Sequence, residues 1–217
     1  MDARRTETKS PTKEMLLERG VDLFSKNGYD GTTTRMIADA CGVNVATIAF
    51  HYRNKEGFYV AVMNHAAQEM EAYFKPFDTK VEEYLAGTTI EEMTWALIDE
   101  FFDLIINVVR DEKRHATLYL LIREQTDPPA GDYPLTRVVY RQSERIIVSL
   151  IKQLQPNIDD ALVAIHSRLI IGGLISQAEH PIFLRRALGL PDDAPLSDHV
   201  WEEVKRFAIS AVRFVIE

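Results

Sequence analysis

The chain has 217 residues, 46% of them hydrophobic, and a formal net charge of −8 at pH 7. This length and composition suit one large or two modest globular domains with a full apolar core. The single cysteine, Cys41, excludes a disulfide framework and a multi-cysteine metal site, and the acidic balance argues against a surface that is basic throughout.

No uninterrupted apolar run approaches the roughly 18 residues that a membrane span needs. The first residues, MDARRTETKSPTK, are polar and lack the apolar stretch of a secretory signal. We therefore expect a cytoplasmic protein with no membrane partner.

Charge is distributed unevenly along the chain. Residues 1–55 hold nine Lys or Arg and seven Asp or Glu, a net of +2, which leaves −10 on the remainder of a chain whose total is −8. A positive end on an acidic body is typical of nucleic-acid binding. The basic arm formed by Arg4, Arg5, Lys9 and Lys13 can lie along phosphates, or it is a solvated tail.

Three helices are predicted near the amino end. The first runs from about Thr12 to Asn27, where an Asn-Gly pair ends it. Two shorter helices follow within residues 33–55. Thr33 or Thr34 is suited to cap the first of these and Asn44 the second, because a side-chain oxygen at such a position accepts an otherwise unpaired N–H.

The spacing of Ala38, Gly42 and Ile48 predicts a helix-turn-helix. This motif needs a small residue where its two helices cross, a glycine at the turn, and an aliphatic residue on the second helix that closes the small core. The third helix of such a bundle is the natural reader of a DNA major groove. On spacing alone, an ordinary helical hairpin is the alternative.

Beyond Lys55 the chain is predicted to be helical, without strand signals. We expect Pro76 to end a helix that begins at Glu56, and a short helix to follow at 81–85. A Thr-x-x-Glu pattern at Thr89 and Glu92 predicts a capping box at the start of a buried helix. Further helices are expected at 112–126, 135–155, 159–179 and from Ser197 or Asp198 to the end. The fold class is therefore all-α, with a three-helix helix-turn-helix domain at 1–55 and a larger helical domain at 56–217.

The segment LFSKNGYDGTTTRMIADACGVNVATIAFHYRNKEGFYVAVM resembles the amino-terminal domain of the TetR/AcrR family of one-component transcriptional repressors. The family pattern has an L-F-x-x-x-G-Y segment, a T-x-x-x-I-A-x-x-A-G-V segment and a T-[LI]-x-x-H-[FY]-x-x-K-E segment. The matching residues here are Leu23, Phe24, Gly28, Tyr29, Thr33, Ile37, Ala38, Gly42, Val43, Thr47, Ile48, His51, Tyr52, Lys55 and Glu56. The resemblance covers about the first 65 residues closely and the rest only by helical pattern. It implies that the helix after Lys55 moves as a pendulum when an effector binds.

The stretch NVATIAFHYRNKEGFY is further similar to the CecR-like subgroup, as are the region around Arg123-Glu124 and the helix that holds Gly172-Gly173. One departure concerns Ala49. Many relatives have a tyrosine there that touches the DNA backbone, whereas neither Ala49 nor the following Phe50 can donate a hydrogen bond from its side chain.

Residues at both short helices form the predicted DNA-contacting set. Threonine hydroxyls at a helix start suit a phosphate oxygen, Arg35 can pair with a guanine edge, and Lys55 is suited to phosphate. Tyr52 is expected to be a core ring at the same time. The alternative for each residue is capping or solvated surface. The set is Thr33, Thr34, Arg35, Asn44, Val45, Ala46, Thr47, His51, Tyr52 and Lys55.

A single helix-turn-helix makes too little contact for strong operator binding, so we expect a homodimer. Two glycines inside one late helix cost stability, roughly 1 kcal/mol each against alanine, and a close helix–helix approach can offset this cost. The resemblance implies a four-helix dimer bundle, and packing within one chain is the alternative. The predicted interface residues are Leu169, Gly172, Gly173, Ser176, Phe207, Ala211 and Phe214.

The resemblance also implies a small-molecule cavity among the middle helices. Candidates are polar or aromatic residues that interrupt apolar stripes, and an aromatic-rich pocket suits a hydrophobic or amphipathic effector. Arg123 and Glu124 can equally form a structural pair. The candidate ligand-binding residues are Trp95, Phe102, His115, Tyr119, Arg123, Tyr140 and His166.

The prediction is a regulator of transcription released from double-stranded operator DNA by a small molecule, with no enzymatic activity, metal or cofactor. A helical di-iron-type enzyme is one alternative, because Glu112 and His115 form the E-x-x-H half-motif of such bundles; no second E-x-x-H pair occurs. A helix-turn-helix that contacts proteins is another. Activation in place of repression also stays open, because the sequence indicates binding and not its consequence for polymerase.

Overall fold

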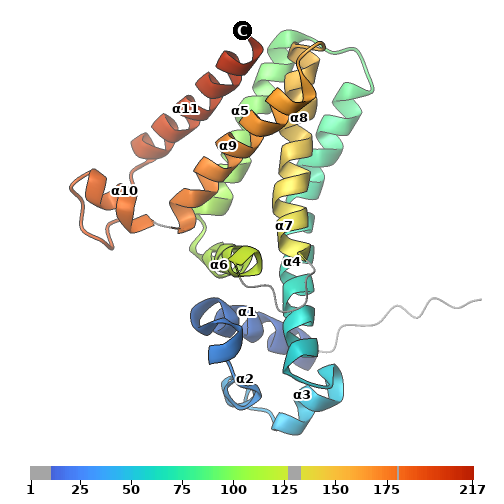
Figure 1. Cartoon of the computed structure of the whole chain (residues 1–217), viewed down its shortest axis with the longest axis vertical. Helices are drawn as coiled ribbons and strands as arrows, with labels where there is room; N and C mark the ends of the chain where they lie inside the picture. Colours follow the sequence, from blue (N-terminus) through green and yellow to red (C-terminus); the bar gives the residue numbers. More distant parts are fainter. Residues whose placement is uncertain (1–10, 127–132, 180) are drawn as a thin grey trace, which may run out of the picture.

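A computed structural model describes residues 11–126, 133–179 and 181–217. All regular structure within these ranges is helical, which confirms the predicted fold class (Figure 1). The basic-arm residues Arg4, Arg5 and Lys9 lie outside the described residues. The elements are α1 (Pro11–Gly31), α2 (Thr34–Cys41), α3 (Val45–Tyr52), α4 (Lys55–Leu85), α5 (Glu91–Arg110), α6 (Glu112–Thr126), α7 (Pro134–Thr136), the π-helical η1 (Arg137–Gln142), α8 (Ser143–Leu154), α9 (Asp160–Glu179), α10 (Pro181–Ala187) and α11 (Asp198–Ile216).

The helices form a small head and a larger body (Figure 1). The head consists of α1, α2 and α3 at one end of the molecule, and α4 extends from the head along the body. Helix α6 lies across α1, and α5 packs against α8, α9 and α11. The head is therefore attached to the body through α4 and through the contact between α1 and α6.

The predicted local signals of the helix-turn-helix are confirmed. Thr33 Oγ1 accepts a hydrogen bond from Met36 N over 3.1 Å, and Asn44 Oδ1 accepts one from Ala46 N over 2.9 Å. Gly42 ends α2 in the left-handed conformation, with φ of 64°, where glycine pays no Cβ penalty. These caps set the ends of α2 and α3 and thereby the angle at which α3 is presented.

The core of the head includes the start of α4. Phe24, Ile37, Ile48 and Phe58 are fully buried, with Phe58 coming from α4. Helices α1 and α4 approach closely at Gly20, where an added Cβ would lie 2.4 Å from Val62 Cγ2 on α4. The head thus folds around the first turns of a helix that continues into the body.

Helix α4 corrects one prediction. It runs unbroken through Pro76 to Leu85, so the expected end at Pro76 and the separate helix at 81–85 are wrong. An interior proline costs a helix roughly 3 kcal/mol, because its nitrogen lacks a hydrogen and its ring crowds the preceding turn. Here the buried side chains of Phe74, Phe77 and Val81 continue the apolar face past the exposed Pro76. Tertiary burial outweighs the local signal.

The predicted capping box at the start of α5 does not form. The helix begins at Glu91, and its N-cap residue, Ile90, makes no side-chain cap hydrogen bond. Thr89 Oγ1 instead accepts a hydrogen bond from Gln153 Nε2 on α8 over 2.6 Å. The prediction that this helix is buried is correct, since Phe101 and Phe102 are fully buried.

Glu124 forms hydrogen bonds with the start of the segment predicted as one helix over 135–155. Its buried carboxylate accepts hydrogen bonds from the backbone N–H groups of Leu135, over 3.1 Å, and Thr136, over 2.6 Å. The segment is helical but passes through the π-helical turn η1 before α8. Arg123 points to α1 instead, so the two residues do not form the structural pair considered above.

Candidate nucleic-acid interface

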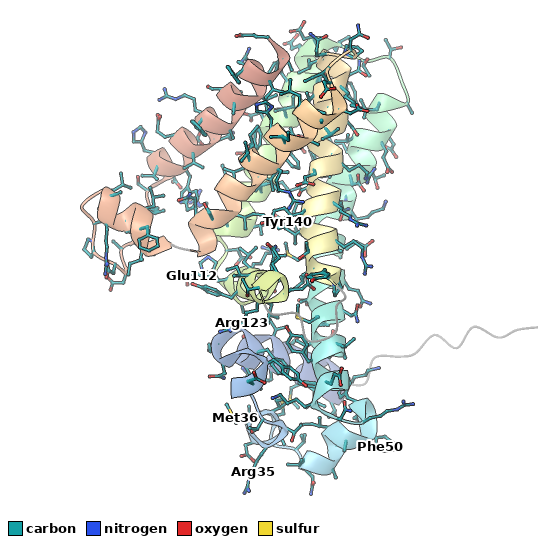
Figure 2. All side chains as sticks on the ribbon, in the orientation of Figure 1. Arg35, Met36, Phe50, Glu112, Arg123 and Tyr140 are labelled. Atoms are coloured by element: carbon teal, nitrogen blue, oxygen red, sulfur yellow. The ribbon has the colours of Figure 1, made fainter. Side chains whose placement is uncertain are left out.

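Helix α3 presents one face to the core and the opposite face to solvent. Ile48 and Tyr52, four residues apart, are buried and anchor the helix. Phe50, on the other side, has 83% of its surface exposed, and Figure 2 places it at the end of the head remote from the body. The α3 face that points away from the body is therefore free to enter a groove.

Helix α2 adds polar and charged groups at the same end of the molecule. Arg35 and Met36 are exposed on its first turn (Figure 2). The Thr33 hydroxyl already accepts the cap hydrogen bond, which leaves its own hydrogen available for a phosphate oxygen. Arg35 is thus positioned as a donor beside α3.

The remaining predicted contacts divide between surface and core. His51 is exposed, and Lys55 Nζ lies 4.2 Å from the centre of the Tyr29 ring, a cation–π contact that holds the ammonium beside the head. Tyr52 lies in the core, its ring 4.9 Å from that of Phe58. Its hydroxyl is buried without a hydrogen-bond partner among the described residues, and burial raises the pKa of Tyr52 to about 12. The structure therefore gives Tyr52 a packing position, with no donor offered to DNA.

Three of the predicted ligand-binding residues line one pocket. His115, Tyr119 and Arg123 on α6 face Asp22 and Lys26 on α1 across a space of about 550 Å³. Arg123 Nε donates a hydrogen bond to the backbone carbonyl of Ser25 over 3.1 Å (Figure 2). This pocket lies between the head and the body, so a molecule in it would touch both.

The other four predicted ligand-binding residues are not brought together. Phe102 is fully buried in the core, and Trp95 and Tyr140 lie under the guanidinium groups of Arg213 and Arg168 respectively, each at 4.2 Å. The fourth, His166 on α9, is near the Phe214 ring. The structure thus does not place these four residues around one pocket with His115, Tyr119 and Arg123.

The predicted dimer residues lie on a solvent-facing surface of α9 and α11. Leu169, Phe207 and Phe214 are 65%, 75% and 73% exposed, and nothing lies within 4 Å of a Cβ built on Gly172 or Gly173. Leu169, Gly173, Ser176 and Phe207 also line a largely apolar groove of about 520 Å³. Packing within one chain leaves most of the surface of these three large side chains exposed, although Phe214 meets the His166 ring with centroids 6.2 Å apart.

Glu112 and His115 are not part of a metal site in the structure. Within the described ranges, no group of three or more His, Cys, Asp or Glu side chains is arranged to hold a metal ion. The His115 ring nitrogen Nε2 lies 2.9 Å from the carbonyl oxygen of Val109.

Among the helices of the described residues, none has both the length and the apolar character needed to cross a membrane.

The fold and the exposed outer face of α3 form a helix-turn-helix of the kind that DNA-binding proteins use. Residues 16–62 match the family model for bacterial regulatory proteins of the tetR family. The chain is 33% identical over 92 residues to a probable HTH-type transcriptional regulator, YttP of Bacillus subtilis, which covers 42% of each chain. It is 25% identical over 118 residues to the regulator RutR of Escherichia coli, covering 54% of this chain and 50% of RutR. The chain thus spans half or less of the length of these curated relatives.

Solved structures match over nearly the whole chain. The regulator MbdR from Azoarcus sp. CIB has a TM-score of 0.63 at 22% identity, covering 92% of this chain and 98% of MbdR. FadR from Bacillus subtilis, solved with stearoyl-CoA, has a TM-score of 0.54 at 13% identity, covering 94% and 97%. At these identities the likeness shows the fold. The family model adds a likeness to tetR-family regulatory proteins over residues 16–62, and the named relatives are HTH-type transcriptional regulators.

Phe50, which the structure exposes on the outer face of α3, is absent from the predicted DNA-contacting set. The signal was present, because Ile48 and Tyr52 define the buried face of α3 and Phe50 falls on the opposite side. The attachment of Arg123 to α1 joins residues almost 100 positions apart, and no local pattern indicates it.

Proposed function

We propose that this protein is a DNA-binding transcriptional repressor that a small-molecule effector releases from its operator. The observation that carries the proposal is the exposed outer face of α3 in a capped helix-turn-helix, with Arg35 beside it. A face of this kind fits the major groove of double-stranded DNA. The names of the relatives, which are regulators and not enzymes, support a regulatory over an enzymatic role.

The DNA-contacting residues in this proposal are those that the head exposes. Phosphate contacts come from Thr33, Thr34 and Lys55, and base contacts from Arg35 and the face of α3. Residues 1–55 act as the DNA-binding domain and 56–217 as the effector-binding and dimerisation domain, although the start of α4 packs in the head core. Since operator DNA lies in the bacterial cytoplasm, the protein acts there.

The protein acts as a homodimer through α9 and α11. Three large apolar side chains on these helices are exposed, and the two adjacent glycines leave room for a close approach. A twofold dimer places two α3 helices on one face of the DNA, which two half-sites a helical turn apart require.

Effector release requires a ligand that binds more tightly to a DNA-incompetent arrangement of the two heads. Helix α4 and the contact between Arg123 and α1 are the two connections that such a change must cross. The sequence around NVATIAFHYRNKEGFY and the Gly172-Gly173 helix favour a CecR-like member of the family. The pocket between α1 and α6 is a candidate effector site with an amphipathic lining.

Selection of binding sites from random double-stranded DNA by the full chain tests the proposal. We expect a palindromic consensus whose two halves are separated by about one helical turn. Compounds that release the selected site are then screened by fluorescence anisotropy. Failure to enrich any sequence above random DNA would contradict the DNA-binding function and favour a role in protein contacts.

A further inference from the structure

We propose that Phe50 reads the operator through the 5-methyl groups of thymine, so that α3 recognises bases by apolar contact. This inference rests on the proposed DNA-binding function and specifies the chemistry of its base readout. Three observations carry it: the apolar outer face of α3, the shortage of hydrogen-bonding side chains on that helix, and the contact that orients the Phe50 ring.

The outer face of α3 is largely apolar. Val45, Ala46, Ala49 and Phe50 are all exposed, and Phe50 lies one turn beyond Ala46. Single exposed apolar residues are common on protein surfaces, but here four occur on one eight-residue helix. In a helix-turn-helix, the second helix enters the major groove. The edges of base pairs are therefore the surface that this apolar face would contact.

Helix α3 has few groups that can read bases by hydrogen bonding. The side chains that form paired hydrogen bonds with guanine or adenine are those of Arg, Lys, Asn and Gln, and the segment VATIAFHY contains none of them. Asn44, which precedes it, uses its Oδ1 to cap Ala46 N. Thr47 and His51 are therefore the polar side chains that α3 itself offers to base edges.

The thymine methyl is the apolar group that a major groove presents to such a face. It projects from C5, and the other three bases show only donors and acceptors there. The Phe50 ring meets the His51 ring edge to face, with centroids 5.1 Å apart. This contact holds the phenyl group on the outer face, where it can cover a methyl group. Burying one methyl group corresponds to about a four-fold change in affinity.

The test uses the full chain and its selected operator. Each thymidine that faces α3 is replaced by deoxyuridine, whose base keeps every hydrogen-bonding group of thymine and lacks only the C5 methyl group. We expect the dissociation constant to rise about four-fold for each methyl that Phe50 covers. In a second arm, cytosine replaces thymine and 5-methylcytosine then replaces cytosine; restoring the methyl should recover part of the lost affinity.

The variant Phe50→Ala tests whether the Phe50 ring is the group that contacts the thymine methyl. Because Phe50 is exposed, the variant should fold as the parent does, which circular dichroism checks. We expect Phe50→Ala to bind the thymine operator at least ten-fold more weakly and to lose its sensitivity to uracil. The control Phe183→Ala removes an exposed phenyl from α10 in the body and should retain both affinity and uracil sensitivity.

The outcomes separate this inference from the proposed function. Specific binding that is indifferent to uracil overturns the methyl readout and leaves the DNA-binding function intact. A second outcome also overturns the methyl readout: Phe50→Ala loses the same affinity for all sequences and keeps its sensitivity to uracil. The ring would then contact the sugar-phosphate backbone. Absence of any selected sequence contradicts the proposed function itself.

Discussion

Arg123 on α6 donates a hydrogen bond from Nε to the backbone carbonyl of Ser25 on α1, over 3.1 Å, and its Nη2 donates to the next carbonyl, that of Lys26, over 3.4 Å. One guanidinium of the body thus binds the last turns of the helix that opens the head. The helical backbone of α1 is interrupted at Gly28, with φ of 72° and ψ of 179°, so the carbonyl groups just before it lie at a helix end. Carbonyl groups at such an end lack partners within the helix, and the helix dipole favours a cation there. In the proposed function, this contact would link effector binding in the body to the position of the head.

Replacing Arg123 by alanine should separate operator binding from release by the effector. We expect the free energy of unfolding to fall by about 1–2 kcal/mol, since two hydrogen bonds from a charged, half-buried group are lost. Operator affinity without effector should stay within a few-fold, while the effector concentration needed for release changes. Chemical denaturation and anisotropy measure the two quantities. Arg186→Ala, which removes an exposed guanidinium paired with Asp192, is the matched control and should alter neither.

Gly28 faces the same guanidinium from α1. Its φ is 72°, and an added Cβ would lie 2.8 Å from Arg123 Nη1. With ψ of 179°, this backbone conformation is one that essentially only glycine adopts, so Gly28→Ala should lower the free energy of unfolding by about 1–3 kcal/mol through backbone strain, with a further loss from the displaced arginine. The double variant with Arg123→Ala should lose less than the sum of the two single variants. Gly31→Ala, at a position without positive φ, is the control; an equal loss there would contradict this account.

Replacing Tyr52 by phenylalanine tests whether this residue packs or contacts DNA. The buried hydroxyl has no hydrogen-bond partner among the described residues, so its removal should leave stability unchanged or raise it by about 1 kcal/mol. Operator affinity should not change. A loss of specific binding by a normally folded Tyr52→Phe protein would restore Tyr52 to the DNA-contacting set.

The same variant predicts a difference in alkaline stability. The folded-state pKa of Tyr52, raised by burial to about 12, lies above the value near 10 of an exposed tyrosine. The unfolded chain therefore ionises first, so this group does not change the free energy of unfolding below pH 10 and lowers it as pH rises from 10 to 12. Burial also raises the pKa of Tyr29 and Tyr73, so the parent and Tyr52→Phe curves must be compared directly. The variant should lose less stability over this interval in urea titrations.

A charge on the exposed face of α11 should abolish the dimer. Phe207→Asp places a carboxylate where the second copy is proposed to pack, and an unpaired charge in an apolar interface is strongly unfavourable. Light scattering should show a folded monomer with weakened operator binding, because one head contacts only one half-site. Ile90→Asp, on an exposed loop between α4 and α5, should remain dimeric. A dimer that survives Phe207→Asp would place the interface elsewhere.

The amino-acid sequence by itself determined the features that depend on neighbouring residues. The caps at Thr33 and Asn44 and the left-handed turn at Gly42 involve hydrogen bonds and torsions within three or four residues, so their residue types indicate them directly. The all-α class followed from apolar periodicity in the same way. The family resemblance rested on the same short segment, which is also the part of the chain that the family model matches.

Tertiary structure alone decided the features in which distant burial competes with a local signal. Helix α4 continues through Pro76 because buried aromatic residues on both sides outweigh the lost hydrogen bond, and Thr89 bonds Gln153 in place of capping α5. The exposure of Phe207 and the reach of Arg123 to Ser25 depend on how α11 and α6 pack. Such contacts join residues far apart in the chain, and their energies exceed the propensity differences that a sequence pattern reveals.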